Sequence, residues 1–375
     1  MQDSHSVAVS NQRSAVSRTH SRPRLFPLTS DLRPRASRRV AAFTLTELLI
    51  VIAIIAVLAS LTAAAAINAL RASKRNGIVL EIKNVSAAIE NFKVDYGAYP
   101  PNAMNPDPRN NPPAGSPTAL AQADFVRMFK KAFPRHQESQ SLMLAMCGQN
   151  LSGATGYNLL NGMTPTEALV FWLGGFSSDE QFPISGPGGP SYISGESEIL
   201  EDRNVRYEFD KTLLKPGREL RYLVDLNNDN DTNDPGEDRT LNLRQFIPKG
   251  SEQPLAYFDT SRHKPMKYDV GFTPGGSTNV VYALKKGREG FSGMLTKADL
   301  TFIDPKFQVV HCGLDGEWGS YGASTSDLAT NVQQLAIFPS GPNTNPSWVF
   351  VGAIADNLSN FTDGALADAS EEAEE

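Results

Sequence analysis

Cysteine and histidine are both scarce in this chain of 375 residues, which contains two cysteines and five histidines. The histidines after residue 42 are His136, His263 and His311, and none has a metal-ligand spacing or a recognisable nucleophile motif beside it. The segment 290–293 also lacks the pattern of a nucleophile elbow. The sequence therefore gives little support to catalysis, and we predict that the protein is not an enzyme.

The two cysteines, Cys147 and Cys312, are too few to form a disulfide framework. If the body of the chain is exported, the two thiols could pair in an oxidising compartment and close a long loop. The alternative is two unrelated buried thiols, and the sequence leaves both open.

Acidic residues are rare in the first 42 residues, which hold two Asp against eight Arg and so carry a net charge of +6. Because the whole chain has a net charge of −6, the rest carries −12. We interpret residues 1–42 as a disordered basic leader. The charge asymmetry predicts a cytoplasmic N-terminus and an exported body. An acidic body also argues against nucleic acid as a partner of the large domain.

Charge is absent from residues 48–70, a run of 23 residues that begins after Glu47 and ends before Arg71. A run of this length can cross a bilayer as a helix. Proline is absent from residues 43–96, so a single helix about 80 Å long is predicted there. Its first part, 43–70, is predicted to be transmembrane, with Asn76-Gly77 as a point of bending or local unwinding.

The second part of this helix, residues 71–96, is predicted to be amphipathic and to pack on a globular domain. Its apolar residues recur at alternating spacings of four and three: Ile78, Ile82, Val85, Ile89, Phe92 and Tyr96. An ordinary secretory signal would be cut after the apolar run, within 63–66. The length of the run, and a glutamate that a signal core would avoid, favour a signal cut in front of it.

Residues 43–54, FTLTELLIVIAI, resemble the N-terminal signature of type IV pilins and type II secretion pseudopilins. The resemblance implies that a prepilin peptidase cuts between Ala42 and Phe43 and methylates the new amine. It also implies that Glu47, at mature position five, pairs with the N-terminus of a neighbouring subunit. The family usually has glycine where this chain has Ala42, which is also small. A carboxylate in hydrocarbon is tolerable when a cation satisfies it, which agrees with this role.

The chain after residue 96 is predicted to complete an α+β, pilin-like fold, with the long helix packed on an antiparallel sheet. Residues 97–203 read as a loop and a helical insertion, 204–363 as the sheet domain and 364–375 as an acidic tail. Helix caps are predicted at Ser116-Pro117 and at the capping box Thr164–Glu167. The turn at Gly97 also resembles the helix end of pseudopilins.

Predicted strands are short runs of β-branched or aromatic residues between Gly, Pro and Asn turns. They are 205–209, 220–226, 241–247, 255–258, 280–284 and 307–312.

The segment 225–238 is dense in oxygen ligands, and Asp225, Asn227, Asp229 and Asp231 alternate as in a calcium-binding loop. It is not an EF-hand, because Asn230 stands at the sixth position and Gly236 at the twelfth. The alternative is a polar Asn/Asp turn between two strands.

Two C-terminal segments, 313–319 and 356–361, resemble the part of the major pseudopilins where calcium orders the last loop. The resemblance implies Asp315 and Asp356 as ligands, although the two segments are further apart here. The alternative is two tight turns.

Together these features predict a structural pseudopilin or pilin-like subunit of a type II secretion machine or a related type IV filament. It would be a single-pass inner-membrane protein with a periplasmic body. The implied partners are prepilin peptidase, other pseudopilins, the inner-membrane assembly platform and secreted cargo. Glu47 argues against the tip pseudopilin, which lacks this glutamate. The insertion favours a minor subunit, whereas the C-terminal motifs resemble the major one.

Two alternatives stay open at this stage. One is a membrane-anchored or secreted calcium-dependent binding protein or adhesin, for which the apolar helix is only an anchor. The other is a subunit of a DNA-uptake or twitching pilus, which shares all of the N-terminal chemistry.

Overall fold

The structure is a computed structural model that describes residues 44–103, 114–149, 159, 161–200, 203–262, 272–273, 280–286, 300–319, 337–338, 350 and 352–369. The chain divides into two compact units, Met1–Ser60 and Leu61–Glu375. The boundary between them falls inside the first helix, α1 (Leu45–Tyr96).

Helix α1 is uninterrupted, which agrees with the absence of proline from this stretch. It runs through Asn76-Gly77, so the predicted unwinding there is not formed. The helix ends as predicted at Gly97, whose φ of +68° is the left-handed conformation of a C-cap. The N–H of Gly97 donates to the carbonyl of Lys93 at 2.6 Å.

Three shorter helices follow: α2 (Pro117–Ala132), α3 (Gln140–Met146) and α4 (Pro165–Leu173). Both predicted caps are confirmed. The Ser116 side chain accepts the N–H of Ala119, and Thr164 and Glu167 form a reciprocal capping box. The described residues also form two 3₁₀ helices, η1 (Lys211–Leu213) and η4 (Gly352–Asp356).

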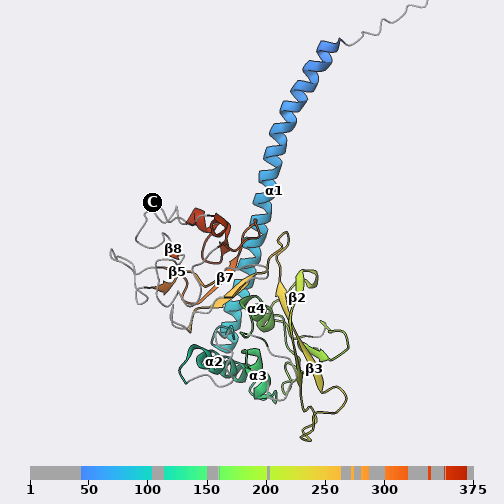
Figure 1. Cartoon of the computed structure of the whole chain (residues 1–375), viewed down its shortest axis with the longest axis vertical. Helices are drawn as coiled ribbons and strands as arrows, with labels where there is room; N and C mark the ends of the chain where they lie inside the picture. The colour runs from blue at the N-terminus through green and yellow to red at the C-terminus, as the bar shows by residue number, and fades with distance from the viewer. Residues whose placement is uncertain are drawn as a thin grey trace, which may run out of the picture. The chain divides into compact units, whose positions relative to one another are not determined.

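The described strands form three small sheets. The first has the order β1-β3-β2 (Ser191–Ile193, Asp238–Phe246 and Leu214–Leu223), and Figure 1 shows β2 and β3 side by side. The second has the order β4-β7-β9 (Ala256–Asp259, Phe307–His311 and Leu358–Ser359). The third has the order β6-β5-β8 (Thr301–Phe302, Lys285–Lys286 and Ile337–Phe338).

This arrangement confirms an α+β fold but corrects the predicted sheet in four respects. The described strands form three sheets instead of one, and β5 pairs with β8 in parallel. Residues 205–209 form no strand: the N–H groups of Arg206 and Tyr207 both donate to the carbonyl of Leu173, at 3.0 Å each. This segment is therefore attached to the last residue of α4 instead of to a strand. In 280–284, pairing is limited, among the described residues, to a bridge between Val281 and Phe272.

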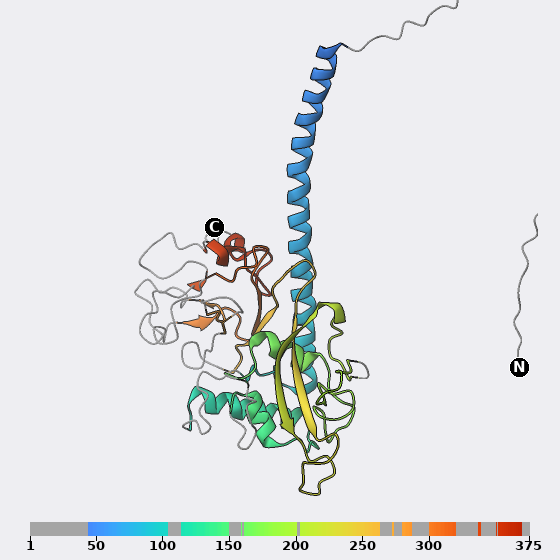
Figure 2. The same cartoon turned by 45° about the vertical axis from the view of Figure 1, so that its right-hand side comes forward.

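The main hydrophobic core gathers around the second part of α1, as its periodicity predicts. The stripe from Ile78 to Phe92 belongs to one cluster with side chains from α2, α3, α4, β2, β3 and β7. Figure 2 shows this part of the helix beside those elements. A second cluster surrounds β5 and β6 and includes Trp318 and Cys312.

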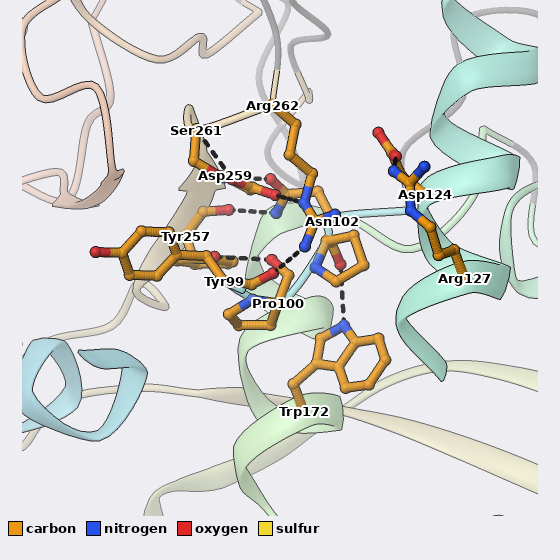
Figure 3. Close-up of polar contacts among 11 residues, drawn as sticks. Tyr99, Pro100, Asn102, Asp124, Arg127, Trp172, Tyr257, Asp259, Ser261 and Arg262 are labelled. Carbon is orange, nitrogen blue, oxygen red and sulfur yellow. Dashed lines mark hydrogen bonds and ion pairs between the residues drawn. The ribbon is translucent and has the colours of Figure 1, made fainter. Parts of the chain in front are cut away.

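The segment that follows α1 is fixed by three successive carbonyl groups, shown in Figure 3. The carbonyl of Tyr99 accepts a bond from Arg262, and that of Pro100 accepts the hydroxyl of Tyr257 at 2.8 Å. The carbonyl of Pro101 accepts the indole N–H of Trp172 at 2.9 Å.

The side chain of Asn102 continues this attachment along the edge of β4 (Figure 3). Its amide nitrogen donates to the carbonyl of Tyr257, and its oxygen accepts the N–H of Asp259, each at 2.6 Å. The exit of α1 is therefore held by α4 and β4 together, which sets the position of the helix in the body.

Candidate functional site

The start of α1 places Glu47 in a reciprocal arrangement with Thr44. The N–H and the hydroxyl of Thr44 both donate to Oε2 of Glu47, each at 2.9 Å. The N–H of Glu47 donates to the Thr44 hydroxyl oxygen at 3.2 Å. This is a capping box, in which a threonine at the N-cap and a glutamate three residues later satisfy each other's backbone donors.

The capping box leaves one carboxylate oxygen for another group. Both bonds from Thr44 end on Oε2, and no contact of Oε1 is recorded among the described residues. A cation that approaches this end of the helix could therefore bind Oε1 without breaking the cap. The sequence contains a signal for this arrangement at residues 44–47, Thr-x-x-Glu before an apolar run.

The residues that follow Glu47 are apolar and exposed. Leu48, Leu49, Ile50, Ile52 and Ile54 each keep more than half of their side-chain surface accessible. In the part of the chain that the structure describes, α1 is the one helix long and apolar enough to cross a membrane. A soluble surface rarely exposes so much contiguous apolar area, so this stretch needs lipid or other helices around it.

The stretch that holds the capped glutamate and the start of the exposed apolar helix also matches a known family motif. Residues 37–63 match the family described as the prokaryotic N-terminal methylation motif. The chain carries the type IV pilin signature. The motif spans Ala42, Phe43 and Glu47, so the resemblance inferred from the sequence is confirmed, although Ala42 and Phe43 lie outside the described residues.

The signature supports a type IV pilin-like subunit with a membrane-anchoring helix. The motif implies processing by prepilin peptidase and assembly into pilus-like filaments. No curated protein and no solved structure matches the chain.

The acidic segment predicted to resemble a calcium loop connects β2 to β3, and its oxygens already bind backbone within the loop. Asp225 accepts the N–H groups of Asp229 and Asn230, at 3.2 and 2.9 Å. Asn227 accepts the N–H of Asp229, and Asp229 accepts that of Asp231. The two bonds accepted by Asn227 and Asp229 are Asx turns, and they agree with the alternative of a polar connection between strands.

The C-terminal pair predicted from the resemblance, Asp315 and Asp356, lies at the end of β7. One oxygen of Asp356 accepts the N–H of Leu314 at 2.6 Å, and the other contacts Arg75 of α1 at 3.1 Å. Burial raises the pKa of Asp315, and the negative charge of Asp356 raises it further, so the two carboxylates act on each other. The bond that Asp315 accepts from the N–H of Glu317 acts in the opposite direction.

Neither acidic region forms a ready metal centre. Among the residues that the structure describes, no group of three or more His, Cys, Asp and Glu side chains is arranged to hold a metal ion. Calcium therefore stays a prediction from the sequence.

Both cysteines are buried and are free thiols, so the candidate disulfide between Cys147 and Cys312 is not formed. Cys147 lies in the main core at the end of α3, and Cys312 lies in the second cluster after β7. Burial raises the pKa of the Cys312 thiol to about 12 and also raises that of the Cys147 thiol, so neither is a reactive thiolate.

One serine lies beside a histidine, but the geometry does not support catalysis. Ser251 Oγ is 2.7 Å from Nε2 of His311, while the N–H of Gly313 donates to Nδ1 at 3.0 Å. Because Nδ1 accepts, Nε2 carries the proton and cannot take one from the serine. Burial lowers the pKa of His311 to about 4, so this histidine is a neutral structural group. His263 and segment 290–293 lie outside the described residues.

Proposed function

We propose that this chain is a structural subunit of a type II secretion machine or a related type IV filament. It would be cut between Ala42 and Phe43, methylated at the new amine and assembled through α1. One observation carries the proposal: the methylation motif at residues 37–63 coincides with the capped glutamate at the start of an exposed apolar helix. In this proposal the body is exported to the periplasm.

The capping box gives the proposed assembly step a geometry. With Oε2 of Glu47 held by Thr44, Oε1 is the atom that would accept the α-ammonium group of a neighbouring subunit. A charge-assisted bond of this kind is stronger than a neutral one, and in a low-dielectric surrounding it is strongly favoured over an unpaired carboxylate. The pair would then set the axial position of one subunit against the next. Prepilin peptidase, other pseudopilins, the assembly platform and secreted cargo are the proposed partners.

The test is the mature N-terminus. The full chain is expressed with and without a prepilin peptidase, and its first peptide is identified by mass spectrometry. We expect N-methylated Phe43 only when the peptidase is present. An intact Met1, or a start after the apolar run, would contradict the proposal and support a membrane-anchored or secreted binding protein. A chain with Phe43→Asp is the control for specific processing.

A further inference from the structure

Three of the cationic side chains of α1 contact a partner among the described residues, and two do not. The helix contains five: Arg71, Lys74, Arg75, Lys83 and Lys93. The last three have partners: Arg75 contacts Asp356 at 3.1 Å and Asp368 at 3.6 Å, Lys83 contacts Asp363 at 3.4 Å, and Lys93 donates to the Tyr99 hydroxyl at 3.1 Å. Arg71 and Lys74 are exposed and have no ion pair within the described residues.

The two unpaired cations lie directly after the uncharged run. Arg71 is the first residue beyond it, and the helix advances about 6 Å from Leu70 to Lys74. The polar layer on each side of a bilayer is about 5–7 Å thick, so both cations fall within it if residues 48–70 cross the hydrocarbon. The buried face of α1 begins at Ile78, so Arg71 and Lys74 lie between the membrane span and the core of the body.

The body contributes a further cation at the same level of the helix. The turn after β3 approaches Lys74 closely: a Cβ added at Gly250 would lie 3.6 Å from Cγ of Lys74. Lys249 precedes this glycine and is exposed. The close turn packs on the stem of Lys74 and leaves its ammonium group free to extend.

Among the described residues, no acidic group forms an ion pair with Arg71 or Lys74. Helix α1 has no Asp or Glu between Glu47 and Glu81. Asp356 and Asp368 approach α1 at Arg75. Of the remaining acids, Asp210 interacts with Lys249, and Glu252 is exposed in the turn. The two side chains that follow the apolar run, Arg71 and Lys74, therefore carry positive charge that no described acidic group pairs.

We propose that Arg71 and Lys74, with Lys249 beside them, form a binding surface for the phosphate groups of anionic phospholipids. The inference rests on the proposed function only in requiring that α1 cross the membrane with the body on one side. The leaflet concerned is the one that faces the body. A positive cluster at headgroup level attracts anionic lipid, and long cationic side chains reach the interface while their stems stay on apolar surface.

This surface has a further consequence for topology. Lys and Arg favour the cytoplasmic side of a membrane, so cations on the exported side oppose export of the body. The leader, with eight arginines in residues 1–42, outweighs them before cleavage. After cleavage the headgroup contacts would hold the body at the membrane surface until the subunit is extracted.

The test uses the full chain at one copy per nanodisc, with equal amounts of phosphatidylglycerol and phosphatidylethanolamine. Lipid retained after mild detergent extraction is counted by native mass spectrometry. The variants are Arg71→Gln/Lys74→Gln and, as a matched control, Lys83→Gln/Lys306→Gln. The control removes the same charge from exposed residues that are paired with Asp363 and Glu90.

We expect the wild type and the control to retain more phosphatidylglycerol than phosphatidylethanolamine. In the Arg71→Gln/Lys74→Gln variant this excess should fall by at least about fivefold, which is the change in affinity expected for the loss of one cation at headgroup level. The excess should also fall with added salt. Equal retention by all three chains would overturn the inference, as would equal loss in the control. So would an effect that appears only with two copies per disc, because the cations would then bind a second subunit. A chain that is cut before Phe43 but retains no excess of phosphatidylglycerol would refute the proposed binding surface, and the proposed function would still stand.

Discussion

Glu167 and Arg218 form a two-point ion pair that joins α4 to β2. The Nε of Arg218 donates to one carboxylate oxygen of Glu167 at 3.0 Å, and Nη2 donates to the other at 2.6 Å. The side chain of Glu167 is 1% exposed, whereas that of Arg218 is 37% exposed. The same carboxylate caps α4 by accepting the N–H of Thr164. One buried acid therefore fixes both the start of a helix and its contact with a sheet.

We expect Glu167→Ala to lower the free energy of unfolding by about 3 kcal/mol, because it removes a helix cap and leaves Arg218 without its carboxylate. Urea unfolding of the full chain in detergent, followed by tryptophan fluorescence, measures this. The exposed pair Arg135–Glu180 supplies the control: Glu180→Ala should change stability little, since surface pairs contribute little. Equal effects of the two variants would refute the role of the buried pair.

The carboxylate at the start of α1 leads to a prediction about assembly. We expect Glu47→Ala and Glu47→Val to insert in the membrane as the wild type does, because both changes make the helix more apolar. Incorporation into filaments should fall, since the neighbouring amine then lacks its acceptor. Membrane fractionation measures the first property, and the yield of sheared filaments measures the second.

Thr44 provides the internal comparison for this prediction. Thr44→Ser keeps the capping hydroxyl and should retain most of the filament yield, whereas Thr44→Val keeps the shape and loses the hydroxyl's bond to Oε2. Normal filament yield with both Glu47 variants would show that the carboxylate is not part of assembly.

Features determined by local physics were predictable from the sequence. The absence of proline and the four-three spacing located α1 and its buried face, and the caps at Ser116 and Thr164 follow from the preference of hydroxyl side chains for helix starts. Glu47 stood out because a charge inside an apolar run needs a partner.

Features determined by contacts between distant segments were not predictable. The alternating residues at 205–209 read as a strand, but the N–H groups of Arg206 and Tyr207 bond to the carbonyl of Leu173 at the end of α4. The division of the strands into three sheets depends on which strands meet, and periodicity carries no such information. Cys147 and Cys312 belong to separate clusters, which no spacing in the sequence reveals.

Calcium binding stays a prediction that solution measurements can decide. We expect calcium to raise the melting temperature of the full chain, because a cation would relieve repulsion among carboxylates that lie together. Asp229→Asn should remove this shift if the loop before β3 is the site, and Asp356→Asn should remove it if the end of β7 is the site. Differential scanning calorimetry with excess calcium or chelator measures the shift, and an unchanged melting temperature would eliminate the metal.

His311 leads to a prediction about pH. Its pKa is about 4 in the folded protein, chiefly because of burial, against 6.5 for an unperturbed histidine. Between these two values the unfolded chain binds more protons than the folded one, so stability should fall as the pH decreases from 6.5 towards 4. The full difference corresponds to a loss of about 3 kcal/mol. His311→Gln removes the titrating group, so its unfolding free energy should vary less with pH across this window. The other titrating groups are present in both chains, so parallel curves for the wild type and His311→Gln would mean that this histidine does not contribute to acid sensitivity.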